Sequence, residues 1–207
     1  MTTYFDSHRF NYVIVSSTTH GTWLPGDERG FVGNTYDGIH NEFGTPCDAD
    51  IPKLKSYAKN IMKEPPIILN TEQANLILEH WQKVIPQVGW YLFSVAIMSN
   101  HFHVVLASPT GPKKEDYLRT LKARASFSLN KKYGKRNWWT VSGSVRYCFD
   151  ERSLNARIEY VMKQENPLVI WRNPQGFDLQ VYATPRTASV AQHSRAASVA
   201  VLRETCG

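Results

Sequence analysis

The stretch Trp90–Ala107, WYLFSVAIMSNHFHVVLA, decides the fold class of this chain. Residues 90–98 are apolar and aromatic and predict one strand, and residues 101–107 predict a second. Only Ser99 and Asn100 separate the two strands, which is typical of a β-hairpin and therefore of antiparallel pairing. The sequence thus predicts a central antiparallel hairpin.

Helices and further strands are expected on both sides of this hairpin. Residues 10–18 predict a first strand and residues 139–149 a fourth. Helices are expected at residues 52–63, 71–84 and 114–133, and from Asp150 or Ser153 to about Gln164. The central hairpin and this order of elements predict an α+β fold, with an antiparallel sheet and helices packed on one of its faces.

Length and composition suit one domain with a sizeable core. The chain has 207 residues, of which 42% are hydrophobic. Residues 1–182 are expected to form this domain, whereas residues 183–207, poor in large apolar side chains, predict a flexible tail. The sequence has no apolar run of about 18 residues, so no membrane span is expected. The polar N-terminus has no apolar signal core, which favours a cytoplasmic protein.

Positive charge is concentrated in one segment. The chain has a formal net charge of +6, and residues 113–136 alone contain nine basic residues against two acidic ones. Such a local concentration is typical of a nucleic-acid interface. A charge run by itself favours the alternative of a solvated helix face.

Two histidines of the second hairpin strand share one face. Side chains alternate across a strand, so His101 and His103 point to one side while Phe102 and Val104 point to the other. Imidazole is a common ligand of divalent transition metals and also serves as a general base. Two histidines hydrogen-bonded at a sheet edge are the alternative, and this spacing alone favours that alternative.

A later helix carries a tyrosine and a glutamine on one side. Tyr160 and Gln164 are four residues apart, which places them on the same helix face. The tyrosine offers a hydroxyl nucleophile and the glutamine a neutral oxygen ligand. A metal held by the two histidines and Gln164 would lie beside the Tyr160 hydroxyl. Alternatively, Tyr160 lies at the boundary of the core and Gln164 faces water.

Together, these motifs resemble those of the HUH single-tyrosine nucleases, and more narrowly those of the REP-associated tyrosine transposases. The segment MSNHFHVVL, residues 98–106, resembles the HUH strand of that family. The segments SGSVRYCFDE, residues 142–151, and IEYVMKQENP, residues 158–167, resemble its end region. The similarity extends over about residues 10–166.

The resemblance implies a ferredoxin-like antiparallel sheet and an endonuclease and strand transferase that depends on Mg²⁺ or Mn²⁺. Its substrate would be single-stranded DNA that carries a hairpin, such as a REP palindrome. His101, His103 and Gln164 would hold the metal, and Tyr160 would form a 5′-phosphotyrosine intermediate. The protein is expected to act as a monomer or a homodimer.

With such a substrate, the basic segment acquires a function. Phosphate contacts beside the site are expected from Arg119, Lys122, Arg124, Lys131 and Lys132. Trp138 and Trp139 either stack on unpaired bases or open a strand in the core.

Two other functions compete with this one. The first is a catalytically retired protein that binds DNA hairpins, which the intact set of four site residues argues against. The second is a metal-dependent hydrolase unrelated to DNA, which the basic segment argues against.

Overall fold

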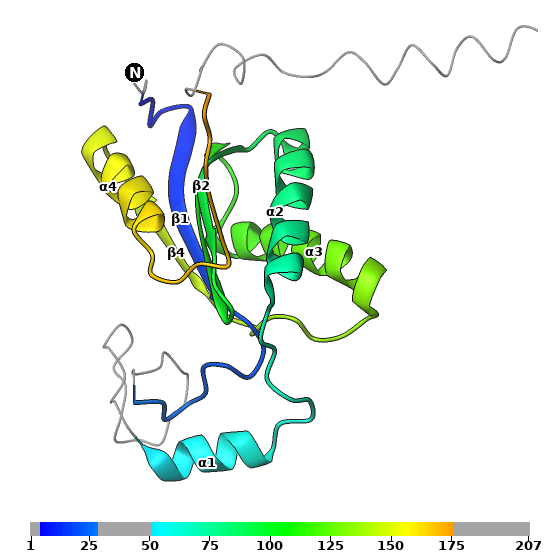
Figure 1. Ribbon diagram of the computed structural model, residues 1–207. Helices are drawn as coiled ribbons and strands as arrows, with labels where there is room; N and C mark the ends of the chain where they lie inside the picture. The colour runs from blue at the N-terminus through cyan, green and yellow to red at the C-terminus, as the bar shows by residue number, and fades with distance from the viewer. Residues whose placement is uncertain (1–4, 29–50, 176–207) are drawn as a thin grey trace, which may run out of the picture. The chain divides into compact units, whose positions relative to one another are not determined.

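The computed structural model describes residues 5–28 and 51–175 (Figure 1). The strands in this part of the chain are β1 (Phe10–Thr18), β2 (Tyr91–Ile97), β3 (His101–Pro109), β4 (Ser144–Cys148) and β5 (Val169–Arg172). The helices are α1 (Pro52–Asn60), α2 (Thr71–Val84), α3 (Lys114–Tyr133) and α4 (Glu151–Met162), with a 3-10 turn, η1, at Pro86–Val88. The domain limit predicted at residue 182 and the tail predicted at 183–207 lie outside the described residues.

The strands form one antiparallel sheet in the order β4-β1-β3-β2-β5. The elements β1, α2, β2, β3, α3 and β4 follow the β-α-β-β-α-β pattern of the ferredoxin-like fold. The β2–β3 hairpin is present as predicted, and the Met98 N–H donates to the His101 carbonyl at 2.8 Å across its turn. The predicted α+β class and its antiparallel sheet are confirmed.

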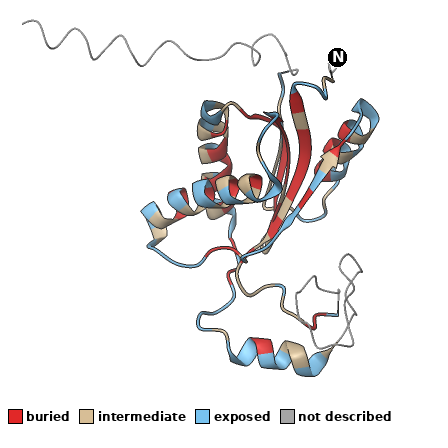
Figure 2. Cartoon of the chain, turned by 180° about the vertical axis from the view of Figure 1, so that it is seen from behind, coloured by how far each residue is buried: buried red, intermediate tan, exposed pale blue. Residues whose placement is uncertain are grey.

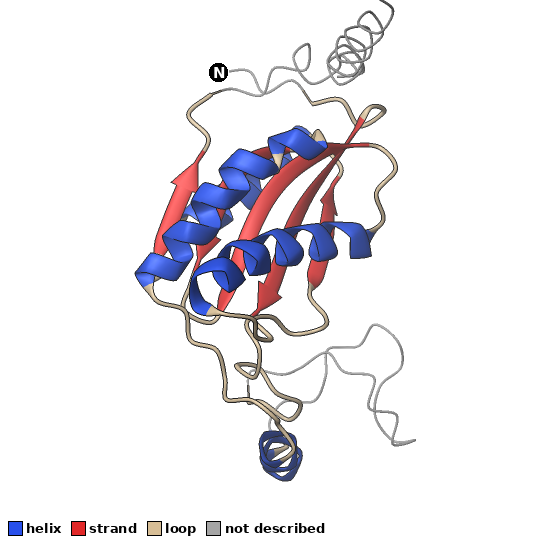
Figure 3. Ribbon diagram, turned by 90° about the vertical axis from the view of Figure 1, so that its right-hand side faces the viewer, coloured by secondary structure: helices blue, strands red, loops and turns tan. Residues whose placement is uncertain are grey.

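Helices α2 and α3 cover one face of the sheet, as Figure 3 shows. The core on this face joins Val13 and Val104 of the strands to Trp81 of α2 and Leu121 of α3. The Trp81 indole N–H donates to the Leu121 carbonyl at 3.0 Å, and the Trp81 ring packs edge-on against Phe102. Buried residues accordingly line the strands and the inner sides of both helices (Figure 2).

Helix α4 differs from the prediction that all helices pack on one face. It lies on the opposite side of the sheet from α2 and α3 (Figure 1) and contacts strands β1 to β5. Its buried residues Leu154, Ile158 and Val161 need an apolar surface, and the second sheet face offers one around Ile14 and Val105. His101 and His103 belong to this second face, so α4 packs on the side that carries them.

Some element boundaries differ from the predictions. Strand β4 begins at Ser144, and Trp139 forms only an isolated bridge with Thr19. Helix α4 ends at Met162 instead of Gln164, because the chain turns before Asn166, whose φ of 50° is left-handed. Its N-cap is Asp150, one of the two predicted residues, and Asp150 and Ser153 form a capping box. Within the described ranges, no helix is both long and apolar enough to cross a membrane.

Candidate active site

The pairing of β1 with β3 sets the positions of the two histidines. Ser16 lies opposite His103 and Thr18 opposite His101, so these four side chains share one sheet face. The two imidazole rings are 5.0 Å apart between centroids and are nearly perpendicular, at 81°. Both residues are partly buried. The structure therefore brings the two predicted histidines to a single place beneath α4.

Each imidazole is hydrogen-bonded at the same ring nitrogen. The Ser16 hydroxyl oxygen lies 2.5 Å from Nδ1 of His103, and Oδ1 of Asn100 lies 2.6 Å from Nδ1 of His101. An Asn oxygen only accepts, so with this amide orientation His101 carries its proton on Nδ1. A metal contact at either ring would then fall to Nε2.

Burial also determines the charge of one ring. It lowers the pKa of His103 to about 4, with repulsion from His101 as the smaller cause. His103 is therefore a neutral imidazole near neutral pH, which is the form that binds metals.

The depressed pKa of His103 predicts acid sensitivity of the fold. An unfolded chain binds a proton at a histidine below about pH 6.5, whereas folded His103 binds one only near pH 4. The unfolded state thus binds more protons in this window. The contribution of neutral His103 to the stability of the folded state is therefore complete above pH 6.5 and is lost as the pH falls towards 4. We expect His103→Gln to flatten the loss of unfolding free energy between these pH values, by at most about 1.4 kcal/mol per pH unit. Urea denaturation at several pH values measures how the unfolding free energy depends on pH. A slope in the variant equal to that of the unchanged chain would contradict the prediction.

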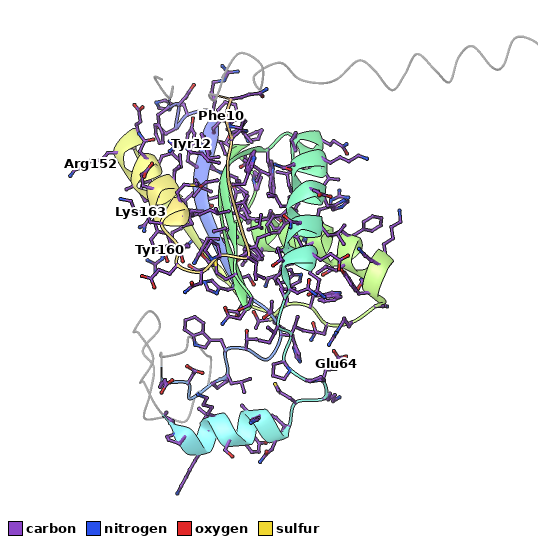
Figure 4. All side chains as sticks on the ribbon, viewed as in Figure 1. Phe10, Tyr12, Glu64, Arg152, Tyr160 and Lys163 are labelled. Atoms are coloured by element: carbon purple, nitrogen blue, oxygen red, sulfur yellow. The ribbon has the colours of Figure 1, made fainter. Side chains whose placement is uncertain are left out.

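Tyr160 reaches the histidine pair from α4. Its ring packs edge-on against His103, with 5.3 Å between centroids and an angle of 70°. Figure 4 shows Tyr160 near the C-terminal end of α4, with Arg152 near the other end. The Tyr160 side chain is 46% exposed. A tyrosine and a histidine that are far apart in sequence thus meet at a surface that solvent reaches.

Gln164 follows α4 and turns back towards it. Its side-chain Nε2 donates to the Tyr160 carbonyl at 3.1 Å, so the amide is anchored next to the tyrosine. Because Nε2 makes this bond, Oε1 is the side-chain atom left to serve as the predicted metal ligand. Among the described residues, no group of three or more His, Cys, Asp or Glu gathers in a way suited to a metal. Two imidazoles and one amide oxygen are nevertheless a donor set that fits a divalent cation.

The predicted phosphate contacts lie elsewhere. All five are on α3, which packs on the sheet face opposite the histidines. Arg119 pairs with Asp116 at 2.6 Å, and Lys132 pairs with Glu72. Arg124 and Lys131 are exposed and form no ion pair within the described part of the chain. The structure therefore does not bring this basic segment together with Tyr160.

Lys122, the remaining member of this set, supports a loop. Its ammonium donates to the carbonyls of Thr140, Val141 and Ser142, at 2.8, 3.1 and 2.7 Å. Burial lowers the pKa of Lys122 to about 8, which leaves it mostly protonated at pH 7 with three donors for three acceptors. The loop that it holds leads into β4.

This geometry predicts a structural effect for Lys122. We expect Lys122→Met to lower the free energy of unfolding by about 1–3 kcal/mol, because it leaves three carbonyls without their donor. Lys131→Met is the matched control, since Lys131 is an exposed lysine of the same helix. Chemical denaturation of both variants measures the difference, and equal stability would argue against a structural role for Lys122.

Trp138 and Trp139 belong to the core. Trp138 donates from its indole nitrogen to Asn130 Oδ1 at 2.8 Å, and Trp139 packs edge-on against Phe102 at 5.2 Å. Both are almost completely buried. Of the two alternatives for these residues, the core position is confirmed.

Sequence reasoning missed three parts of the site. Ser16 gave no signal, because its partner His103 is 87 residues away. Asn100 did occupy the hairpin turn next to the HFH motif, which is a local signal. The loop HGTWLPGD, residues 20–27, had no predicted role, and the structure places its start against that turn. The Thr19 N–H donates to the Asn100 carbonyl at 2.8 Å, and Thr22 Oγ1 lies 3.2 Å from the same oxygen.

The comparison with protein families assigns the chain to a class of DNA-processing proteins. Residues 60–164, half of the chain, match the model of the family described as Transposase IS200 like. This chain belongs to the IS200-like transposase family. The matched range contains all of the residues predicted to act at the site, from His101 to Gln164.

Two solved structures are also similar. One is the structure of a REP-associated tyrosine transposase bound to a REP hairpin, with 9% sequence identity and a TM-score of 0.40. The match covers 78% of this chain and 68% of that one. The other is a Deinococcus radiodurans R1 protein named as a transposase, with 13% identity and a TM-score of 0.41. It covers 80% of this chain and 98% of that one. No curated protein sequence matches this chain.

Proposed function

We propose that this protein is a metal-dependent endonuclease and strand transferase acting on single-stranded DNA that carries a hairpin. The observation that supports this most directly is the contact of the Tyr160 ring with His103, which itself lies against His101. This contact joins a hydroxyl nucleophile to two metal-binding groups on one side of the sheet. Membership of a transposase family supplies DNA as the substrate class.

Tyr160 is the nucleophile in this proposal. Its hydroxyl oxygen attacks the scissile phosphorus, and the bond from phosphorus to the 3′-oxygen of the preceding nucleotide breaks. The phenol loses one proton and the leaving oxygen gains one, so the products are a 5′-phosphotyrosine and a free 3′-hydroxyl. A second 3′-hydroxyl can reverse the step and join strands, because the bond from Tyr160 to phosphorus is itself a phosphoester that replaces the one broken. The 46% exposure of Tyr160 suits a long polymeric substrate.

His101, His103 and Gln164 would hold the Mg²⁺ or Mn²⁺ ion. When bound, this cation supplies a Lewis acid that polarises the scissile phosphate. The protein keeps His103 neutral by burial and anchors Gln164 through its bond to the Tyr160 carbonyl. The first feature keeps a lone pair of His103 available to a cation, and the second holds the Gln164 amide close to the backbone of Tyr160.

The basic residues of α3 are assigned to a different part of the substrate. Arg124 and Lys131 are exposed and have no acidic partner among the described residues, so they are the members best suited to phosphate. Because α3 lies across the sheet from Tyr160, these contacts concern DNA away from the cleaved bond. Arg119, Lys122 and Lys132 each have a partner within the protein.

A covalent-adduct assay tests the proposal. The full chain is incubated with Mn²⁺ and a hairpin-bearing single-stranded oligonucleotide labelled on the 3′ side of the cleaved bond. We expect a labelled protein band that survives denaturing electrophoresis. A double-stranded oligonucleotide of the same sequence is the control. Binding of the hairpin without any adduct would instead favour the catalytically retired alternative.

A further inference from the structure

The two histidines have polar supports on the protein side of the site. Ser16 Oγ lies 2.5 Å from His103 Nδ1, and Asn100 Oδ1 lies 2.6 Å from His101 Nδ1. We propose that Ser16 and Asn100 are positioning residues, which hold both imidazoles with the proton on Nδ1 so that Nε2 of each ring serves a shared divalent cation. This inference rests on the proposed function, because it takes the two histidines to be metal ligands.

The Asn100 oxygen selects the Nδ1–H tautomer of His101, and the Ser16 hydroxyl is compatible with the same tautomer of His103. Asn100 Oδ1 is an acceptor only, and the Ser16 hydroxyl can accept as well as donate. A neutral imidazole with Nδ1–H has its lone pair on Nε2. Metal-bound histidines in proteins usually donate their other ring nitrogen to such a partner, which fixes both the tautomer and the ring orientation. Two adjacent histidines that both carry the proton on Nδ1 can both offer Nε2 to one shared cation.

The backbone around Ser16 has little freedom to move. Ser16 lies within β1 and pairs with His103 on one side and with Ser144 of β4 on the other. A Cβ atom on Gly143 would lie only 2.7 Å from the Ser16 carbonyl oxygen, so β4 starts in tight contact with this residue. The hydroxyl is therefore presented to His103 from a fixed position.

The turn that carries Asn100 is held from two sides. Its carbonyl accepts the Thr19 N–H at 2.8 Å, and the neighbouring Ser99 carbonyl accepts the Leu69 N–H at 2.7 Å. Thr19, directly after β1, and Leu69, in the segment before α2, thus hold the hairpin turn, and Asn100 of this turn contacts His101. Ligand geometry has to be held within about 0.5 Å for a site to work, and such bonds supply this precision.

The affinity of the full chain for Mn²⁺ alone tests the inference, measured by water-proton relaxation without DNA. Ser16→Val and Ser16→Thr are a matched pair of similar shape, of which only Thr keeps the hydroxyl. Asn100→Leu and Asn100→Asp are a second pair, of which only Asp keeps the acceptor. We expect the Val and Leu variants to bind Mn²⁺ about 10–100-fold more weakly, as for other residues that orient metal ligands, and the Thr and Asp variants to retain binding.

Ser17→Ala is the control for β1, because Ser17 points to the opposite sheet face and its hydroxyl donates to the Ser142 carbonyl at 3.4 Å. Urea denaturation of every variant shows whether each one folds.

His101→Ala and His103→Ala separate the inference from the proposed function. If they lose Mn²⁺ while the Val and Leu variants keep it, the positioning role is wrong and the proposed function stands. If they bind Mn²⁺ like the unchanged chain, both are wrong. An equal loss in Ser17→Ala would also overturn the positioning role.

Discussion

Replacing Tyr160 with Phe should abolish the covalent protein–DNA adduct while leaving the fold and hairpin binding unchanged. The substitution removes only the hydroxyl oxygen, and the ring can keep its edge-on contact with His103. No other atom at this position can form a phosphotyrosine, so we expect adduct below detection on a denaturing gel. Hairpin affinity, measured by gel shift in parallel, should equal that of the unchanged chain.

Tyr147→Phe is the matched control for this experiment. Tyr147 lies on β4 and packs near Phe149 and the Lys114 ammonium, away from the histidine pair. It should form adduct at the normal rate. Adduct that persists undiminished in Tyr160→Phe would remove Tyr160 from the mechanism. Tyr147 and Tyr133 would then be the next candidates.

The second large effect is expected from the histidines. His101→Ala and His103→Ala should each slow cleavage about 10³-fold or more, because a bound cation contributes several kcal/mol of transition-state stabilisation and each 1.36 kcal/mol is tenfold in rate. Excess EDTA should reproduce the loss in the unchanged chain. Rates of hairpin cleavage with and without Mn²⁺ measure these effects.

His80→Ala is the control for a histidine outside the site. His80 is a partly buried residue of α2 that stacks on Phe127, on the other side of the sheet. Its loss should leave the cleavage rate unchanged. Cleavage that continues in excess EDTA would show that the histidine pair is structural, which is the alternative that its spacing alone favoured.

Local sequence determined the hairpin and the faces of its strands. Alternation along a strand has a period of two, so the common face of His101 and His103 follows from their numbers alone. The short Ser99–Asn100 turn determined the antiparallel pairing in the same way. Cap residues such as Asp150 marked a helix start, because capping depends on neighbours within three residues. Each of these features depends on residues that are close in sequence.

The course of α4 was decided by tertiary packing. The sequence predicted this helix, but which sheet face would receive its apolar residues Leu154, Ile158 and Val161 depended on how much apolar surface each face left uncovered. With α2 and α3 on one side, α4 packs on the other and carries Tyr160 to His103. Sequence spacing placed Tyr160 and Gln164 on one helix face, whereas Gln164 in fact follows the helix and turns back to it.

Long-range contacts also decided which polar residues take part in the site. Ser16 meets His103 only because β1 pairs with β3, and Lys122 is occupied only because the loop of residues 140–142 folds over it. A charged side chain looks the same in a sequence whether it faces solvent or three carbonyl groups. The chemistry offered by the histidines, the tyrosine and the glutamine was therefore readable from the sequence. The contact of Ser16 with His103, and the position of the basic helix α3 across the sheet from Tyr160, follow from the packing of elements far apart in the chain.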